Sequence, residues 1–242
     1  MTNIYIVLLF CYSSYKEIFG QCPATSTVSV GYTSVTVTPP GYPFPGYDTN
    51  LSCSWLGSSS ISGASILYRF TDITVNCAGD AINVYNGVDN TGTHVYNYEC
   101  NSGGSGPRNL RYKVSSTGNV YTTFTSDASQ SAPELGFKMY MISGKDFSGT
   151  GCTATQTLTA TITEQYLSSP SFPNTYPTDQ TCTWEISATD SSANIIIDIK
   201  FLNIEFDTSC QYDYFEISES ADAVVLNVLG VGLFENAAQS GW

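Results

Sequence analysis

The sequence predicts an all-β fold, an antiparallel β-sandwich or barrel. Two observations predict it. Short segments alternate apolar and polar residues with a period of two, and Gly, Pro and Asn separate them. No stretch beyond residue 20 keeps the 3.6-residue period of a helix. The cysteines also recur at matched spacings, which predicts two copies of one unit.

Composition narrows the function classes. Apolar residues make up 42% of the 242 residues, enough to fill a core and to argue against a disordered chain. Eight Lys and Arg against 21 Asp and Glu give a net charge of -13. Nucleic-acid phosphates and anionic membrane surfaces attract clustered cations, so neither is the predicted partner.

The chain begins with an apolar run at Ile4–Tyr12. A helix that crosses a membrane needs roughly 20 apolar residues, so this run is too short to span a bilayer. It fits the apolar core of a secretory signal at residues 1–20, with cleavage after Gly20, although Lys16 follows the run instead of preceding it. The alternative is a short buried strand or helix. No second run reaches membrane length, so we expect a soluble, secreted, extracellular protein.

The alternating segments place the strands. We expect strands at Ile66–Phe70, Ile82–Val84, Val120–Phe124, Phe137–Met141 and Ile195–Phe201. Asn86-Gly87 follows the second of them, and this dipeptide is a strong signal for a hairpin turn.

The repeat is clearest in the cysteines. Cys22 and Cys53 are 31 residues apart, and Cys152 and Cys182 are 30 apart. The gap to the next cysteine is 24 residues in the first set and 28 in the second. In an oxidising compartment these cysteines are expected to form disulfides. The small, polar residues 143–151 are the predicted linker between the units.

Sequence motifs repeat with the cysteines. A segment rich in proline and tyrosine leads into Cys-x-Trp at Pro39–Trp55 and again at Pro170–Trp184. In both units an alternating apolar strand is followed by an acidic residue, a cysteine and an Asp three positions later. In this ordered series the chain resembles the CUB family of extracellular β-sandwich modules. The resemblance implies a jelly-roll type sandwich over residues 22–142 and a second copy over residues 152–242.

The resemblance also implies a disulfide framework. It pairs consecutive cysteines: Cys22 with Cys53, Cys77 with Cys100, and Cys152 with Cys182. Spacing alone leaves all three pairings of four cysteines open. Both tryptophans of the Cys-x-Trp motifs are expected to pack against these bridges in the core, rather than to serve as sugar platforms.

The second copy departs from the family pattern. Cys210 is expected to be unpaired, because Leu233 stands where its partner would lie. Residues equivalent to Asn101–Ile142 are also missing from the second copy. We therefore interpret this copy as truncated, and the chain as a fragment or an aberrantly ended product. A sheet without these strands would leave an open edge, and Val224–Val231 is predicted to be an exposed apolar segment. The alternative is that Cys210 and the open edge pair with another chain.

Acidic residues form the candidate metal site. In calcium-binding members of the resembled family, carboxylates at positions matching Asp72, Asp80 and Asp127 hold one ion, and the main-chain oxygen of Ser129 is a further candidate ligand. Calcium takes six to eight oxygen ligands, so several carboxylates must converge. Asp72 stands where the family usually has Glu, and Gly79 where it usually has Tyr.

The second unit carries part of the same motif. Glu205 and Asp213 match it, with Tyr212 before the second acid, but a third carboxylate is missing, so this site is expected to be incomplete. The alternative for both units is that these acids are solvated loop residues.

The resemblance implies recognition and no catalysis. We expect an extracellular protein-binding module that uses calcium to hold a basic residue of its partner. The alternatives are a non-catalytic piece of a larger mosaic hydrolase or lectin, and a small glycosidase with paired carboxylates. The single histidine, His94, cannot supply a zinc protease motif and is predicted to lie at the surface. Asn50-Leu51-Ser52 is the candidate glycosylation sequon.

Overall fold

The computed structural model describes residues 22, 24–76, 79–98, 112–129, 134–190, 193–204, 212–219 and 224–229. All regular structure within these ranges is β-strand, which confirms the predicted fold class. The strands of the first unit are β1 (Ser26–Val30), β2 (Val35–Val37), β3 (Ser52–Ser59), β4 (Ser65–Thr74), β5 (Ala81–Asn86), β6 (Thr93–Tyr98), β7 (Lys113–Ser115), β8 (Asn119–Thr125) and β9 (Gly136–Gly144). Those of the second unit are β10 (Gln156–Ala160), β11 (Thr181–Ala188), β12 (Tyr214–Glu219) and β13 (Val224–Leu229).

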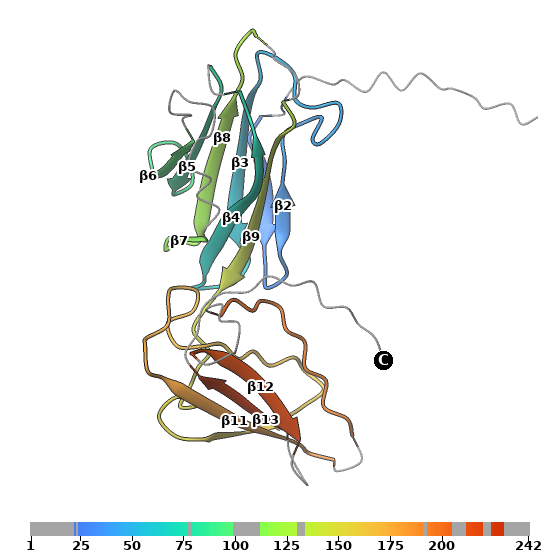
Figure 1. Cartoon of the computed structure of the whole chain (residues 1–242), viewed down its shortest axis with the longest axis vertical. Coiled ribbons are helices and arrows are strands. Elements are labelled where there is room, and N and C mark those ends of the chain that lie inside the picture. The colour runs from blue at the N-terminus through green and yellow to red at the C-terminus, as the bar shows by residue number, and fades with distance from the viewer. Residues whose placement is uncertain are drawn as a thin grey trace, which may run out of the picture.

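The first unit is a sandwich of two sheets (Figure 1). One sheet has the strand order β1-β3-β8-β5-β6, and the other has the order β2-β9-β4-β7. Neighbouring strands are antiparallel except β1 and β3, which run parallel. The same exception recurs in the second unit, where β10 and β11 are parallel. The predicted antiparallel sandwich therefore contains one parallel pair of strands in each unit.

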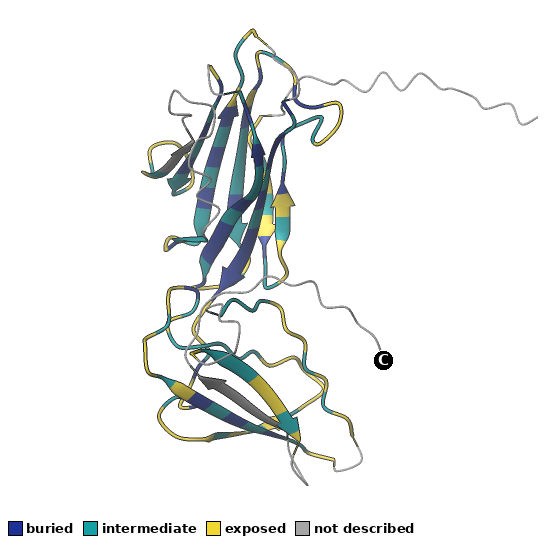
Figure 2. Cartoon of the chain, viewed as in Figure 1, coloured by how far each residue is buried: buried dark blue, intermediate teal, exposed yellow. Residues whose placement is uncertain are grey.

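The core lies between the two sheets and follows the alternation read from the sequence (Figure 2). The buried residues of β8 and β9 face one another there: Val120, Thr122, Phe124, Phe137, Met139 and Met141. The predicted strands around Ile66 and Ile82 are likewise confirmed as β4 and β5. A Cβ atom at Gly57 would lie 2.6 Å from the Met141 sulfur, so the glycine lets Met141 pack between the sheets.

The second unit contains one sheet in the described residues, with the order β10-β11-β13-β12. Its core is small: Cys182, Trp184 and Ile186 are buried together. Trp184 pairs with Gln156 at the start of the parallel ladder, as Trp55 pairs with Ser26 in the first unit.

β13 lies in the position that β8 has in the first unit. Ser52 of β3 and Ala81 of β5 both pair with Thr125 of β8. Their counterparts in β11 and β12, Thr181 and Tyr214, both pair with Leu229 of β13. The expectation of an open edge is therefore wrong for Val224–Leu229, because this strand has a hydrogen-bonded neighbour on each side. The expected exposure of its side chains stays a prediction.

The strand expected at Ile195–Phe201 does not form, which corrects that prediction. Ile195 and Ile197 pack against the Trp184 cluster, but Ile196 is 91% exposed. The corresponding strand of the first unit, β4, is held by β7 and β9 on its two sides. Residues 193–204 have no strand beside them in the described part of the second unit, and an alternating segment needs such a ladder to become a strand.

The expected boundary at residue 142 is also shifted. β9 continues through Gly144, and the buried Ser143 donates a 2.7 Å hydrogen bond from its hydroxyl to the Val30 carbonyl. Two residues of the expected linker therefore belong to the first sandwich.

Two predicted disulfides are present, Cys22–Cys53 and Cys152–Cys182. Trp184 is buried beside its bridge and Trp55 is partly buried against the first core, as expected. The pair Cys77–Cys100, the thiol of Cys210, Glu205 and the signal at 1–20 lie outside the described residues. Within the described residues, the chain has no helix with the length and apolar character that a membrane span requires.

Candidate functional site

A buried tyrosine fixes the first acidic residue of the site. Tyr47 and Asp80 are 1% and 6% exposed, and the Tyr47 hydroxyl donates a 2.5 Å hydrogen bond to Asp80 Oδ2. The same hydroxyl accepts a 2.9 Å bond from the Asn76 backbone N–H. Burial, followed by the bond to Asp80, raises the pKa of Tyr47 far above its usual range. Tyr47 is therefore held as a neutral donor to the Asp80 carboxylate.

Asp127 joins Asp80 through the backbone. The Asp127 N–H donates a 2.7 Å bond to Asp80 Oδ1, so both oxygens of Asp80 are engaged. The Asp127 carboxylate in turn accepts bonds of 2.7 Å from both the Ser129 N–H and the Ser129 hydroxyl. These two bonds lower the pKa of Asp127 and keep it negatively charged.

Gly79 makes room for this carboxylate. A Cβ atom at Gly79 would lie 2.0 Å from Asp127 Oδ2. The departure from the family pattern at this position therefore has a physical reason in this chain: any side chain at residue 79 would collide with Asp127.

Asp72 lies at the same end of the sandwich but on the other sheet. It sits on β4 at a register shift after Phe70, opposite Lys138 of β9. The Tyr42 hydroxyl donates a 2.9 Å bond to Asp72 Oδ2. Burial and this bond raise the pKa of Tyr42, which keeps the phenol protonated.

The structure thus brings Asp80 and Asp127 together and holds Asp72 apart, on its own tyrosine. No three His, Cys, Asp or Glu side chains are grouped closely enough to hold a metal ion in the described part of the chain. Of the expected calcium ligands, Asp80 and Asp127 are linked by a hydrogen bond, whereas Asp72 is bonded to Tyr42. The ligand set itself stays a prediction. The role of the Ser129 main-chain oxygen stays a prediction.

The loops around Asp127 carry further polar groups. The Asn50 N–H donates a 2.7 Å bond to the Asp127 carbonyl, and Asn50 is exposed with a φ of 58°. The Ser126 hydroxyl donates a 2.7 Å bond to the Asp48 carbonyl. The predicted glycosylation site at Asn50 therefore lies beside the carboxylate pair. We call the end of the sandwich that carries Asp72, Asp80 and Asp127 the acidic end.

An apolar residue projects near the acidic end. Phe44 is 80% exposed at the tip of the loop 41–46. The Gly46 N–H closes this loop with a 3.0 Å bond to the Gly41 carbonyl. A Cβ atom at Gly41 would lie 2.0 Å from the Gly46 carbonyl oxygen, so the tight closure depends on glycine there. The same loop supplies Tyr42, which binds Asp72.

The second unit repeats part of this arrangement. The Tyr176 hydroxyl donates a 3.0 Å bond to Asp213, the residue that matches Asp80. Tyr212 is 64% exposed and Asp213 is partly buried. Sequence reasoning named the acids but missed their tyrosine donors, Tyr42, Tyr47 and Tyr176. The Pro/Tyr-rich segment before each Cys-x-Trp motif was the available signal, since all three tyrosines lie in it.

His94 is exposed, as predicted. Its Nε2 atom lies 3.1 Å from Asn83 Oδ1, and its ring centroid is 5.0 Å from that of Tyr85.

Comparison with known proteins points to one class of module. Residues 152–232 match the family model of the CUB domain. Similar curated proteins include rat cubilin, 29% identical over 205 residues, and the Caenorhabditis elegans zinc metalloproteinase nas-39, 29% identical over 195 residues. These alignments cover 81% and 79% of this chain, and so extend over both units.

The chain spans a small part of these relatives, 5% of rat cubilin and 19% of the metalloproteinase. Among solved structures, the CUB1-EGF-CUB2 domains of rat MASP-1 are similar, with 14% identity, a TM-score of 0.40, and coverage of 86% of this chain and 96% of that one. A MASP-1 CUB2 domain crystallised with Ca²⁺ is also similar, with 20% identity, a TM-score of 0.35, and coverage of 48% of this chain and 98% of that one.

Proposed function

We propose that this chain is an extracellular, non-catalytic protein-binding module. Its acidic end binds a calcium ion and, with that ion in place, a basic residue of a partner protein. The observation that carries the proposal is the fixed carboxylate pair of Asp80 and Asp127. Each carboxylate is held by donors of the chain itself, so neither has to be ordered when a cation arrives.

The charge of the pair supports a cationic ligand. Two carboxylates that share a hydrogen-bond network repel one another unless positive charge lies between or beside them. Bonds from Ser129 keep Asp127 ionised. A lysine ammonium group offers three donors and a compact charge, which suits carboxylate acceptors held at a partly desolvated loop end.

Calcium would be held by Asp72, Asp80 and Asp127, and would supply the positive charge that offsets their repulsion. The residues of this chain do the positioning: Tyr47 holds Asp80, Ser129 holds Asp127, and Gly79 leaves space for the Asp127 carboxylate. Phe44 supports a protein partner in particular, because an exposed aromatic ring near fixed charges is typical of interface residues.

Binding to lysine-bearing peptides tests the function. The full chain would be passed over an immobilised peptide with one central lysine, and over the same peptide acetylated at that lysine, in 2 mM Ca²⁺ or in chelator (about the range of extracellular calcium sites). We expect the chain to bind only the peptide with the free lysine. Binding should be weaker in chelator, which removes the ion, and at high salt, which screens the electrostatic contact.

Asp127→Asn and Asp89→Asn form a matched pair of variants for this test. Asp89 accepts bonds from the Thr91 N–H and hydroxyl, as Asp127 does from Ser129. Asp89 follows β5, whereas Asp80 precedes it, so the control charge lies at the opposite end of that strand. Loss of binding with Asp127→Asn alone supports the proposal. Equal loss with Asp89→Asn, or equal binding to the acetylated peptide, contradicts it.

A further inference from the structure

Aromatic rings from the two units meet beside the segment that joins them, residues 145–151. Tyr32, in the loop between β1 and β2, has its ring centroid 4.0 Å from that of Tyr166 and 5.9 Å from that of Phe147. The Phe147 and Tyr166 centroids are 6.0 Å apart. One ring of the first unit is therefore in contact with a ring of the joining segment and a ring of the second unit.

A second aromatic cluster also joins the units. Phe201 of the second unit lies 5.2 Å from Tyr112 of the first and 5.7 Å from Phe172, measured between ring centroids. The guanidinium carbon of Arg69 lies 4.7 Å from the Tyr112 centroid. A Cβ atom at Gly144 would come within 2.3 Å of the Phe172 ring, so this glycine at the end of β9 allows the ring to lie against the first sandwich.

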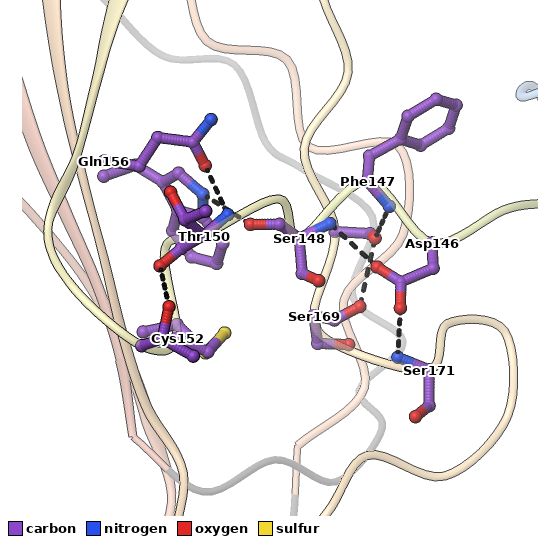
Figure 3. Close-up of a disulfide and its surroundings, with 12 residues drawn as sticks. Asp146, Phe147, Ser148, Thr150, Cys152, Gln156, Ser169 and Ser171 are labelled. Carbon is purple, nitrogen blue, oxygen red and sulfur yellow. Dashed lines mark hydrogen bonds between the residues drawn. A yellow bond between two sulfur atoms is a disulfide. The ribbon is translucent and has the colours of Figure 1, made fainter.

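The joining segment itself is hydrogen-bonded to the second unit (Figure 3). Asp146 accepts a 2.8 Å bond from the Ser148 N–H and a 2.7 Å bond from the Ser171 N–H, one on each oxygen. The Phe147 N–H donates a 2.7 Å bond to the Ser168 hydroxyl. The sequence predicts a linker here from its small and polar residues, and in the structure these residues are hydrogen-bonded to the second unit.

The segment also reaches the core of the second unit. The buried Trp184 donates a 3.3 Å bond from its indole N–H to the Ser148 carbonyl. The Thr183 N–H donates a 2.7 Å bond to the Gly151 carbonyl. A Cβ atom at Gly151 would lie 2.4 Å from the Trp184 Nε1 atom, so the backbone passes directly over the indole ring.

We infer that the two units form one rigid body, with the joining segment clamped between two aromatic clusters. Domains joined by a single flexible tether move independently by default. Here the covalent connection and two separate aromatic contacts fix three points, which is enough to set the orientation of one unit on the other. The acidic end of the first unit and Asp213 of the second are then presented at a fixed separation, whether or not either binds calcium.

Limited trypsin digestion tests the clamp. Lys145 is exposed and is the single Lys or Arg between Lys138 and Lys200, so cleavage after it gives two diagnostic fragments. Proteases cut a segment mainly from its locally open state. We expect slow cleavage at Lys145 in the full chain. The double variant Tyr166→Ala/Phe172→Ala should be cut about tenfold faster, the population change that about 1.4 kcal/mol produces.

Phe44→Ala is the matched control, because it removes an exposed aromatic ring that belongs to neither aromatic cluster. Its cleavage rate should equal that of the wild type. Circular dichroism melting would establish that the double variant keeps folded units, and ¹⁵N relaxation would report whether the two units share one tumbling time. Wild-type cleavage as fast as in the double variant, or separate tumbling times in the wild type, overturns the inference.

Discussion

The Tyr176 hydroxyl donates a 3.0 Å hydrogen bond to the Asp213 carboxylate. This contact corresponds to the 2.5 Å bond from Tyr47 to Asp80 in the first unit. In both units the tyrosine precedes the Cys-x-Trp motif, and the acid lies three residues after a cysteine. The Pro/Tyr-rich segment therefore has a structural role in each unit. It carries a tyrosine hydroxyl that donates to the acid directly before β5 in the first unit and directly before β12 in the second.

Loss of the Tyr47 hydroxyl should destabilise the first unit. Tyr47→Phe removes the hydroxyl that donates to the buried Asp80 and accepts from the Asn76 N–H. We expect a cost of about 1–3 kcal/mol, the usual penalty for a buried polar group that loses its bond. Tyr176→Phe, at a more exposed site, should cost less. Urea unfolding of both variants measures the difference, and equal small losses would show that Asp80 does not depend on its tyrosine.

Alkaline pH should destabilise the chain partly through Tyr47. Its pKa is raised in the folded state above the ordinary value of 10.0, so the folded protein retains a proton that the unfolded chain releases. The stabilisation is complete below pH 10 and is lost as the pH rises toward the folded pKa, by about 1.4 kcal/mol per pH unit for one proton. The urea midpoint would be measured at about pH 8.5 and about pH 10.5, on either side of the ordinary tyrosine pKa. Between these two pH values the midpoint should fall less in Tyr47→Phe than in the wild type. Parallel falls would exclude the linkage.

A side chain at residue 79 should disturb the acidic end without unfolding the sandwich. Gly79→Ala places a methyl group where the Asp127 carboxylate lies, so the carboxylate must move away from Asp80. We expect weaker calcium and peptide binding with nearly unchanged melting. Gly31→Ala is the control, because a Cβ atom there would meet only a hydroxyl, at 3.6 Å. Gly92→Ala is unsuitable, because its Cβ atom would collide with backbone atoms. Binding that stays intact in Gly79→Ala would contradict the position proposed for Asp127.

Trp184 should carry much of the stability of the small second core. Trp184→Phe removes both packed volume and the donor to Ser148, with an expected cost of about 1–3 kcal/mol. Trp55→Phe is the comparison, and it should cost less because Trp55 is partly buried. Thermal melting of each variant gives the order. A larger loss of stability for Trp55→Phe than for Trp184→Phe would contradict this prediction.

Glycosylation at Asn50 should reduce access to the acidic end. Asn50 is exposed, and its backbone bonds to that of Asp127, so a glycan on it would stand beside the carboxylate pair. When the protein is secreted by glycosylating cells, the Asn50→Gln variant should lack the mass of one glycan and should bind the lysine peptide more strongly than the wild type does. Removal of the mass without any gain in binding would place the partner contact elsewhere.

Much of the fold followed from residue periodicity. The alternation at Ile66–Phe70 and Phe137–Met141 became β4 and β9, because each strand has a partner and a core face. The same alternation at Ile195–Phe201 did not become a strand, because alternation describes the faces of a strand and does not supply its neighbour. The position of β13 between β11 and β12 depends on pairing across the sheet, which a local pattern does not encode.

The sequence names the acidic residues of the candidate site, but it does not give their arrangement. The family resemblance implies that Asp80 and Asp127 lie at one end of the sandwich, and in the structure the Asp127 N–H donates a hydrogen bond to Asp80. The separation of Asp72 comes from its tyrosine partner and from the register shift after Phe70, neither of which the spacing of acids reveals.

Calcium titration of the full chain tests the central proposal most directly. Melting temperature would be followed from chelator to saturating Ca²⁺ in the wild type, Asp127→Asn and Asp89→Asn. We predict a clear rise in the wild type and in Asp89→Asn, because an ion at 100 times its Kd stabilises the folded state by about 2.7 kcal/mol. Asp127→Asn should respond little. A wild-type melting temperature that does not change with calcium, or an unchanged response in Asp127→Asn, would contradict calcium binding at the acidic end.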